Sequence, residues 1–329
     1  MIAFVGFTQS RGRNVYVMND DGSALRPISI AFTRVGVYPT VAHQPIWSPD
    51  GKFLLFTVLN SQLPTSTVYI ANINQGDMQT VAAPYEFSVG LGWLADGRIL
   101  CSSLLHHSGQ LKYAIYPDGS HREDFFGRSE DHIQHIIAPG GEYLAKLNRR
   151  DSSIVVQDLR DLQERTVVEK SPSDRQNLQW SPDGGRIAFR ESKGFSLKEN
   201  LYVVERDGSN LHAVGRIASE SGFAWAPNGD KIAGTTPHLK AHKRSFTLDI
   251  ITIDPPKQYP ITVVTRSPES GDFSPTTPDW SPDGRHLAYS TYSSKFENLN
   301  KITLGDKIPQ CLVADDANLT GINSITWAG

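Results

Sequence analysis

The sequence lacks most of the features that mark specialised classes of protein. Only two of its 329 residues are cysteines, which gives no disulfide framework. No apolar run approaches the roughly 20 residues that span a bilayer. The N-terminal stretch MIAFVGFTQSRGRN places its basic residues after its apolar ones, the reverse of a signal peptide. The net charge is only −3. We therefore expect no membrane insertion, no export signal and no nucleic-acid partner, and the sequence assigns no compartment.

Tryptophan is also scarce, and its distribution is the main signal in the chain. Five of the six tryptophans fall in copies of one phrase: IWSPDGKFLLF from Ile46, GWLADGRIL from Gly92, QWSPDGGRIAF from Gln179, AWAPNGDKIA from Ala224 and DWSPDGRHLAY from Asp279. A degraded copy, IAPGGEYLAKL, has Ala138 in the tryptophan position. The sixth tryptophan, Trp327, ends the chain where a copy should start, and MIAFVG at the N-terminus supplies the missing continuation. The repeat is therefore circular.

This repeat predicts the fold. Its units start near residues 327/1, 47, 93, 138, 180, 225 and 280. A period of about 40 to 50 residues made of short strands is typical of a β-propeller, because one four-stranded blade cannot bury its faces alone. We predict an all-β, seven-bladed β-propeller with four-stranded antiparallel blades, forming a single domain over residues 1–329. A C-terminal strand at residues 324–329 is expected to join the N-terminal strands and close the ring.

Each unit divides into four strands joined by turns. Asp-Gly between alternating apolar runs favours a tight turn, so the Ser and Asp residues of the SPDG phrase are interpreted as turn formers and the tryptophans as core residues. Antiparallel order puts the short turns on one face. The second-to-third loops, such as ESKGFSLKEN, and the connections between blades lie on the other, the long-loop face. Long loops on a rigid scaffold usually carry binding residues, so the long-loop face is the candidate for function.

The phrase WSPDGGRIAF followed by YVVERDGS resembles the repeat of TolB-type propellers. The same repeat occurs in the propellers of prolyl-oligopeptidase-type peptidases and of oligogalacturonate lyases. The resemblance covers the whole chain and implies a propeller scaffold. In the peptidases it implies catalysis by a separate α/β domain, and the chain has no Gly-x-Ser-x-Gly motif for one. In the lyases it implies histidines and a divalent metal that help remove a proton next to a uronate carboxylate.

Positions one and three before each tryptophan are expected to face the central channel. They include the strongest candidates for binding a small ligand: Gln44, His135, Asn177, Gln179 and Asp279. A polar tunnel filled with water explains the same residues. His43, His132 and His135 lie near the ends of first strands and are candidate ligands of a divalent metal. Solvated loop histidines are the alternative.

Charge on the long-loop face suggests a second kind of site. The second-to-third loops have an excess of six positive charges, and the connections between blades are acidic. Such a basic rim could steer an anionic partner, and Lys240, Lys243 and Arg244 are its candidate binding residues. Mixed surface charge without a partner accounts for the same pattern.

The sequence thus favours a non-catalytic scaffold that binds protein or peptide partners through the long-loop face. It predicts no catalytic residues and no cofactor, and a chain that is a monomer or part of a larger polypeptide. The first alternative is a metal-assisted polysaccharide (uronate) lyase or a small-ligand receptor with its site at the channel mouth. The second is a sensor or gating module of a larger protein.

Overall fold

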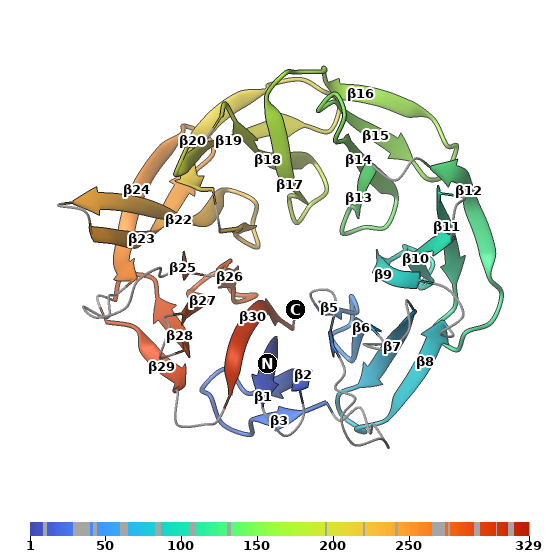
Figure 1. Cartoon of the computed structure of the whole chain (residues 1–329), viewed down its shortest axis with the longest axis horizontal. Coiled ribbons are helices and arrows are strands. Elements are labelled where there is room, and N and C mark those ends of the chain that lie inside the picture. Colours follow the sequence, from blue (N-terminus) through green and yellow to red (C-terminus); the bar gives the residue numbers. More distant parts are fainter. Residues whose placement is uncertain are drawn as a thin grey trace. The chain divides into compact units, whose positions relative to one another are not determined.

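The computed structural model describes strands joined by turns and loops, with no helix among the described residues (Figure 1). No segment of this part of the chain is therefore a helix able to cross a membrane. The described residues are 1–8, 12–28, 40–41, 45–59, 65–82, 87–105, 109–129, 133–194, 196–219, 221–240, 243–264, 274–275, 277–292, 297–306, 308–314 and 319–328.

The chain divides into two compact units. Unit 1 comprises Met1–Ile133 and Asn318–Gly329, and unit 2 comprises Gln134–Ala317. Among the described residues, the strands form seven antiparallel blades, blades 1 to 3 in unit 1 and blades 4 to 7 in unit 2. The first strand is divided into two short strands in blades 2 and 7, and one parallel pair, Ser66 with Phe87, links blades 2 and 3. The prediction of an all-β, seven-bladed β-propeller is confirmed.

The strands of unit 1 follow the predicted repeat. Blade 1 contains β1 (Ile2–Thr8), β2 (Gly12–Met18), β3 (Arg26–Pro27) and β30 (Thr320–Trp327). Blade 2 contains β4 (Thr40–Val41) and β5 (Ile46–Trp47), which both pair with β6 (Phe53–Leu59), then β7 (Ser66–Asn72) and β8 (Met78–Ala82). Blade 3 contains β9 (Phe87–Trp93), β10 (Ile99–Leu105), β11 (Gly109–Ile115) and β12 (Glu123–Ser129).

The strands of unit 2 repeat the same order. Blade 4 contains β13 (Ile133–Ile137), β14 (Tyr143–Asn148), β15 (Ile154–Asp158) and β16 (Glu164–Val168). Blade 5 contains β17 (Asp174–Trp180), β18 (Arg186–Ser192), β19 (Lys198–Glu205) and β20 (His212–Ala218). Blade 6 contains β21 (Phe223–Trp225), β22 (Lys231–Lys240), β23 (Lys243–Thr252) and β24 (Lys257–Val264). Blade 7 contains β25 (Ser274–Pro275) and β26 (Asp279–Trp280), which both pair with β27 (His286–Tyr292), then β28 (Glu297–Thr303) and β29 (Gln310–Val313).

Blade 1 takes its strands from both ends of the chain, as the circular repeat predicted. β30 pairs antiparallel with β1, with Ile2 opposite Trp327 and Phe7 opposite Thr320. The amide of Ala328 also donates to the Met1 carbonyl at 2.9 Å, and the two termini lie close together (Figure 1). β30 begins at Thr320, earlier than the predicted residue 324, because the pairing continues to the end of β1.

The repeated tryptophans pack between consecutive blades. Trp180 joins buried side chains of blades 4 and 5, Trp225 those of blades 5 and 6, and Trp280 those of blades 6 and 7. In unit 1, Trp47 packs against the core between blades 1 and 2, and Trp93 against that between blades 2 and 3. Each blade thus buries its faces against its neighbours within the unit, which is why the large aromatic residue recurs once per blade.

The SPDG phrase forms the turn that was predicted for it. In blade 5, Ser181 Oγ donates to Asp183 Oδ1 at 2.6 Å and accepts from the Arg186 amide at 2.8 Å, while Gly184 has a φ of 66°. Asp183 Oδ1 also accepts from the Gly185 amide at 3.0 Å. The turns that begin at Ser48 and Ser281 have the same bonds. These serines and aspartates are therefore bound within their own turns.

We expect this turn to make stability depend on acid pH. The serine hydroxyl, followed by a backbone amide, lowers the pKa of Asp50, Asp183 and Asp283 below 3.8. A lowered folded-state pKa contributes stability above the unfolded value, and that stability is lost as the pH falls through the folded value. The melting temperature should therefore fall as the pH drops below about 4. Thermal melts between pH 5 and about pH 2 should show a shallower fall for Ser181→Ala, and a slope equal to that of the wild type would contradict the assignment.

Candidate functional site

Several of the residues singled out from the sequence lie outside the described part of the chain. These are Gln44, His43 and His132. The rim residues Lys240, Lys243 and Arg244 are described only in their backbone, where Lys240 pairs with Lys243 and Leu239 with Arg244 at the end of the β22–β23 hairpin. The basic rim therefore stays a prediction.

The other four candidates for the small-ligand site belong to unit 2, and all are half-buried. His135 lies on β13, Asn177 and Gln179 on β17, and Asp279 on β26. Gln179 Nε2 donates to the Phe223 carbonyl of β21 at 2.5 Å, so this side chain joins the first strands of blades 5 and 6. Gln179 thus has a structural use that the sequence did not reveal.

Two tryptophans make similar links between first strands. Trp180 Nε1 donates to the Ile136 carbonyl of β13 at 3.2 Å, and Trp280 Nε1 donates to the Ala224 carbonyl of β21 at 3.1 Å. Together with Gln179, these bonds connect the first strands of blades 4, 5, 6 and 7 in order. His135 precedes Ile136 on β13, and Gln179 precedes Trp180 on β17. The bond between Trp180 and Ile136 therefore holds His135 and Gln179 on the first strands of neighbouring blades.

A β-bulge interrupts β17 at Asn177. The register with β18 shifts between Gln176 and Gln179, and Asn177 has a φ of 54°, in the left-handed region that non-glycine residues seldom adopt. The strict two-residue alternation used to place side chains in the channel does not hold through a bulge. The orientation of Asn177 is set by the bulge and not by that alternation.

No three His, Cys, Asp or Glu side chains gather to hold a metal ion within the described ranges. His135, the one candidate metal ligand among these residues, has polar or electrostatic contacts of its own.

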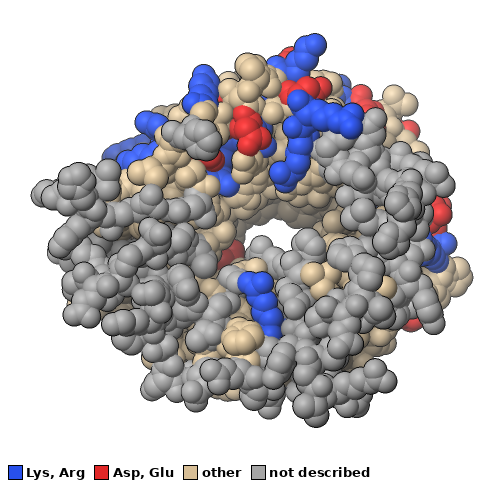
Figure 2. Space-filling model, in the orientation of Figure 1, with Lys and Arg blue, Asp and Glu red and all other residues tan. Residues whose placement is uncertain are grey.

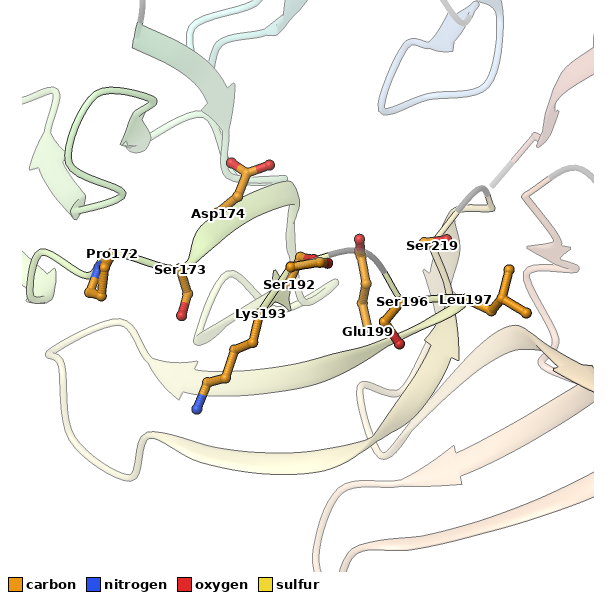
Figure 3. Close-up of a pocket in the computed structure, with 10 residues that line it drawn as sticks. Pro172, Ser173, Asp174, Ser192, Lys193, Ser196, Leu197, Glu199 and Ser219 are labelled. Atoms are coloured by element: carbon orange, nitrogen blue, oxygen red, sulfur yellow. The ribbon is translucent and has the colours of Figure 1, made fainter.

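The described residues line a pocket of about 790 Å³ on the long-loop face of blade 5 (Figure 3). Its walls come from the chain before β17, the β18–β19 loop and the end of β20. These three places share one face in an antiparallel sheet. The lining residues are Pro172, Ser173, Asp174, Ser192, Lys193, Gly194, Ser196, Leu197, Glu199 and Ser219.

Local hydrogen bonds fix the loop that forms this pocket. Ser192 Oγ donates to the Gly194 carbonyl and Ser196 Oγ to the Lys198 carbonyl, both at 2.8 Å. The Ser219 amide donates to the Leu197 carbonyl at 3.1 Å, which ties the β18–β19 loop to the end of β20. The described part of the loop is therefore anchored at both of its strands.

A buried ion pair lies behind the pocket wall. Arg190 and Glu199 have side chains that are only 9% and 8% exposed, and Arg190 Nη1 lies 3.2 Å from Glu199 Oε2. Arg190 Nη1 donates to the carbonyls of Ala218 and Ser219 at 3.1 and 2.5 Å. Burial raises the pKa of Glu199, the charge of Arg190 opposes this rise, and the charge of Asp174 adds to it.

A second buried pair joins blade 5 to blade 4. Arg175 Nε donates to Glu191 Oε2 at 3.0 Å, and both side chains are less than a tenth exposed. Arg175 Nη1 also donates to the carbonyls of Ser152 and Glu169 in blade 4, both at 2.6 Å. Arg175 follows the pocket residue Asp174 and Glu191 precedes the pocket residue Ser192. The pair therefore holds two of the pocket walls in place.

Charged side chains of both signs gather on the surface over β14 to β20 (Figure 2). Around the pocket, Asp174, Lys193 and Leu197 are exposed, whereas Glu199 is buried at its base. The arrangement offers carboxylate and hydroxyl oxygens beside one exposed leucine. Such a surface can bind a polar group that carries an apolar stem.

The pocket residues were not identified from the sequence, although the loop that contains them was assigned to the long-loop face. The available signal was the presence of charged residues, Arg175, Arg190 and Glu191, within strands otherwise expected to be buried. Arg175 and Glu191 lie directly opposite each other in the β17–β18 register. Opposite charges at paired strand positions are a sign of a cross-strand ion pair.

The fold and the loop-face pocket define the chain as a β-propeller with a recessed surface on one blade. No family model matches it. It is 22% identical over 268 residues to the uncharacterized protein Atu1656 of Agrobacterium fabrum, covering 77% of this chain and 86% of the relative.

Solved structures show the same fold at low sequence identity. TolB from Acinetobacter baumannii is similar with a TM-score of 0.57 and 15% identity, over 99% of this chain and 66% of TolB, so the chain spans slightly less than two thirds of that protein. An oligogalacturonate lyase in complex with manganese gives 0.60 and 11% identity, over 91% of this chain and 81% of the lyase. The S511A mutant of a puromycin hydrolase gives 0.69 and 11% identity, over 94% of this chain and 52% of the hydrolase. The resemblance to TolB, peptidase and lyase propellers is thus confirmed at the level of the fold.

Proposed function

We propose that the chain is a non-catalytic binding scaffold that engages a protein or peptide partner through the long-loop face, as a monomer or as part of a larger polypeptide. The observation that carries this proposal is the pocket of about 790 Å³ on blade 5. Its walls are held by two buried ion pairs and by the hydrogen bond from the Arg175 side chain to the Ser152 carbonyl of blade 4. A rigid recess with an exposed rim suits the binding of an extended chain, because the protein loses little conformational entropy on binding.

A photo-crosslinking experiment tests the proposal. A photoreactive amino acid replaces Leu197 at the pocket or, as a matched control, Leu211 on the short-turn face, since these leucines are 40% and 45% exposed. The probe is a pool of random twelve-residue peptides. We expect several times more adducts at Leu197, and competition by the same peptides without label. Equal labelling at the two positions would overturn the proposal.

The proposal includes no resident cofactor, and the alternative of a metal-assisted lyase rests on His43, His132 and His135. Elemental mass spectrometry of the purified protein should find divalent metal well below one ion per chain. Treatment with a chelator should leave the melting temperature unchanged, because only metal bound to the folded state raises it. A stoichiometric ion whose removal lowers the melting temperature would favour the lyase or receptor alternative and would direct mutagenesis to these three histidines.

A further inference from the structure

The base of the blade 5 pocket contains a buried acceptor without a donor. Glu199 Oε2 accepts no hydrogen bond among the described residues, although its side chain is only 8% exposed. Arg190 Nη1, 3.2 Å away, directs its hydrogen bonds to the carbonyls of Ala218 and Ser219 instead. A buried carboxylate oxygen that lacks a donor costs free energy, so a ligand that reaches the Glu199 carboxylate from the pocket and donates to it gains affinity.

The charges around this oxygen favour a cation. The charge of Asp174 acts on the carboxylate of Glu199, and both carboxylates act on the guanidinium of Arg190. Two carboxylates against one guanidinium leave one negative charge in excess. Lys193 also lines the pocket, but its side chain extends away from Asp174 and Glu199 (Figure 3).

The remaining lining suits a long side chain with a charged end. Leu197 is 40% exposed at the rim and offers an apolar surface, as does Pro172. The hydroxyls of Ser173, Ser192 and Ser219 can accept further hydrogen bonds from a group with several N–H donors. Lysine and arginine side chains combine an aliphatic stem with such a group.

We propose that the blade 5 pocket takes a single lysine or arginine side chain of a peptide segment, with its stem on Leu197 and its cationic head between Asp174 and Glu199. This inference rests on the proposed function and specifies the chemistry of the partner at the same site. An acidic segment would meet the excess negative charge, and a segment with an apolar side chain at this position would leave Glu199 Oε2 without a hydrogen bond.

The test measures binding of three sets of synthetic hexapeptides by fluorescence anisotropy. One set contains a single Lys or Arg, one contains Glu or Asp at the same position, and one contains norleucine there. We expect the basic set to bind the wild-type protein most tightly. Asp174→Asn should weaken its binding about three- to tenfold and Glu199→Gln about tenfold or more. Added salt should weaken wild-type binding more than binding by Asp174→Asn.

Two controls keep the result interpretable. Asp207→Asn removes a carboxylate that accepts the Ser209 amide in a turn on the short-turn face, and it should leave binding unchanged. Asp174 is exposed, so Asp174→Asn should fold even if Glu199→Gln, which leaves Arg190 without its buried partner, does not.

N-acetyl-lysine amide alone should bind far more weakly than the peptides. Equal binding would mean that the pocket recognises a free amine, which would overturn the peptide assignment.

The outcomes separate this inference from the proposed function. Peptides that bind at Leu197 without preference for the basic set, or without loss in either carboxylate variant, would overturn the cation inference and leave the scaffold proposal standing. A failure of all three sets to bind, together with equal photo-crosslinking at Leu197 and Leu211, would overturn both.

Discussion

Deleting Thr320–Gly329 should lower the melting temperature by about 10 °C or more. The deletion removes β30 and with it the buried side chains of Ile322, Ile325 and Trp327. Each such side chain contributes roughly 1.5 to 3 kcal/mol by burial, so the loss is about 4.5 to 9 kcal/mol before the lost strand pairing is counted. At about 2 to 4 °C per kcal/mol, this gives the expected shift. Differential scanning calorimetry would measure it.

A circular permutant is the matched control for this deletion. Joining Gly329 directly to Met1 and opening the chain before Thr320 keeps every residue and turns β30 and β1 into a hairpin, because Trp327 already pairs with Ile2. This permutant should melt close to the wild type. A truncated protein that melts at the wild-type temperature would show that β30 does not stabilise blade 1.

The second large effect is expected at the ion pair between Arg175 and Glu191. Arg175→Met leaves a carboxylate buried without its cation and leaves the carbonyls of Ser152 and Glu169 without a donor. Breaking a buried pair in this way should lower the free energy of unfolding by about 3 to 5 kcal/mol. Urea denaturation followed by tryptophan fluorescence would measure the loss.

Two further variants test whether the loss of stability in Arg175→Met comes from the unpaired buried charge. The double variant Arg175→Met, Glu191→Met should be more stable than Arg175→Met alone, since it removes the unpaired charge. Arg160 also pairs with a carboxylate, Asp158, but is 59% exposed, so Arg160→Met should lower the stability far less than Arg175→Met. A loss for Arg175→Met as small as that for Arg160→Met would show that burial of the Arg175 pair has no energetic consequence.

The repeat made the fold predictable because the same local signals recur in each blade. The Trp phrase, the Asp-Gly turn and the circular spacing gave the seven blades, the composite first blade and the structural use of Ser181 and Asp183. The predicted start of β30 at residue 324 was later than the observed Thr320, because the repeated phrase indicates the core of a strand and not how far its pairing extends. Blade assignment thus depended on local chemistry that a single sequence contains.

The blade 5 pocket was not predictable in the same way. Trp180 pairs with Ile187 next to the turn. If the pairing continued from there without a bulge, Arg175 would lie opposite Ser192. The bulge at Asn177 adds one residue to β17 and moves Arg175 opposite Glu191. Because the repeat pattern contains no signal for this bulge, it does not place the ion pair, and the pocket wall that the pair holds is missed as well.

The composite first blade also affects how the chain folds during synthesis. β1 leaves the ribosome about 300 residues before β30, so the edge of β1 that pairs with β30 has no partner strand during almost the whole of translation. An unpaired strand edge can pair with other nascent chains. Blade 1 can therefore be completed only after β30 has been made, and a translation product that stops before β30 retains an open edge that chaperones and proteases can recognise.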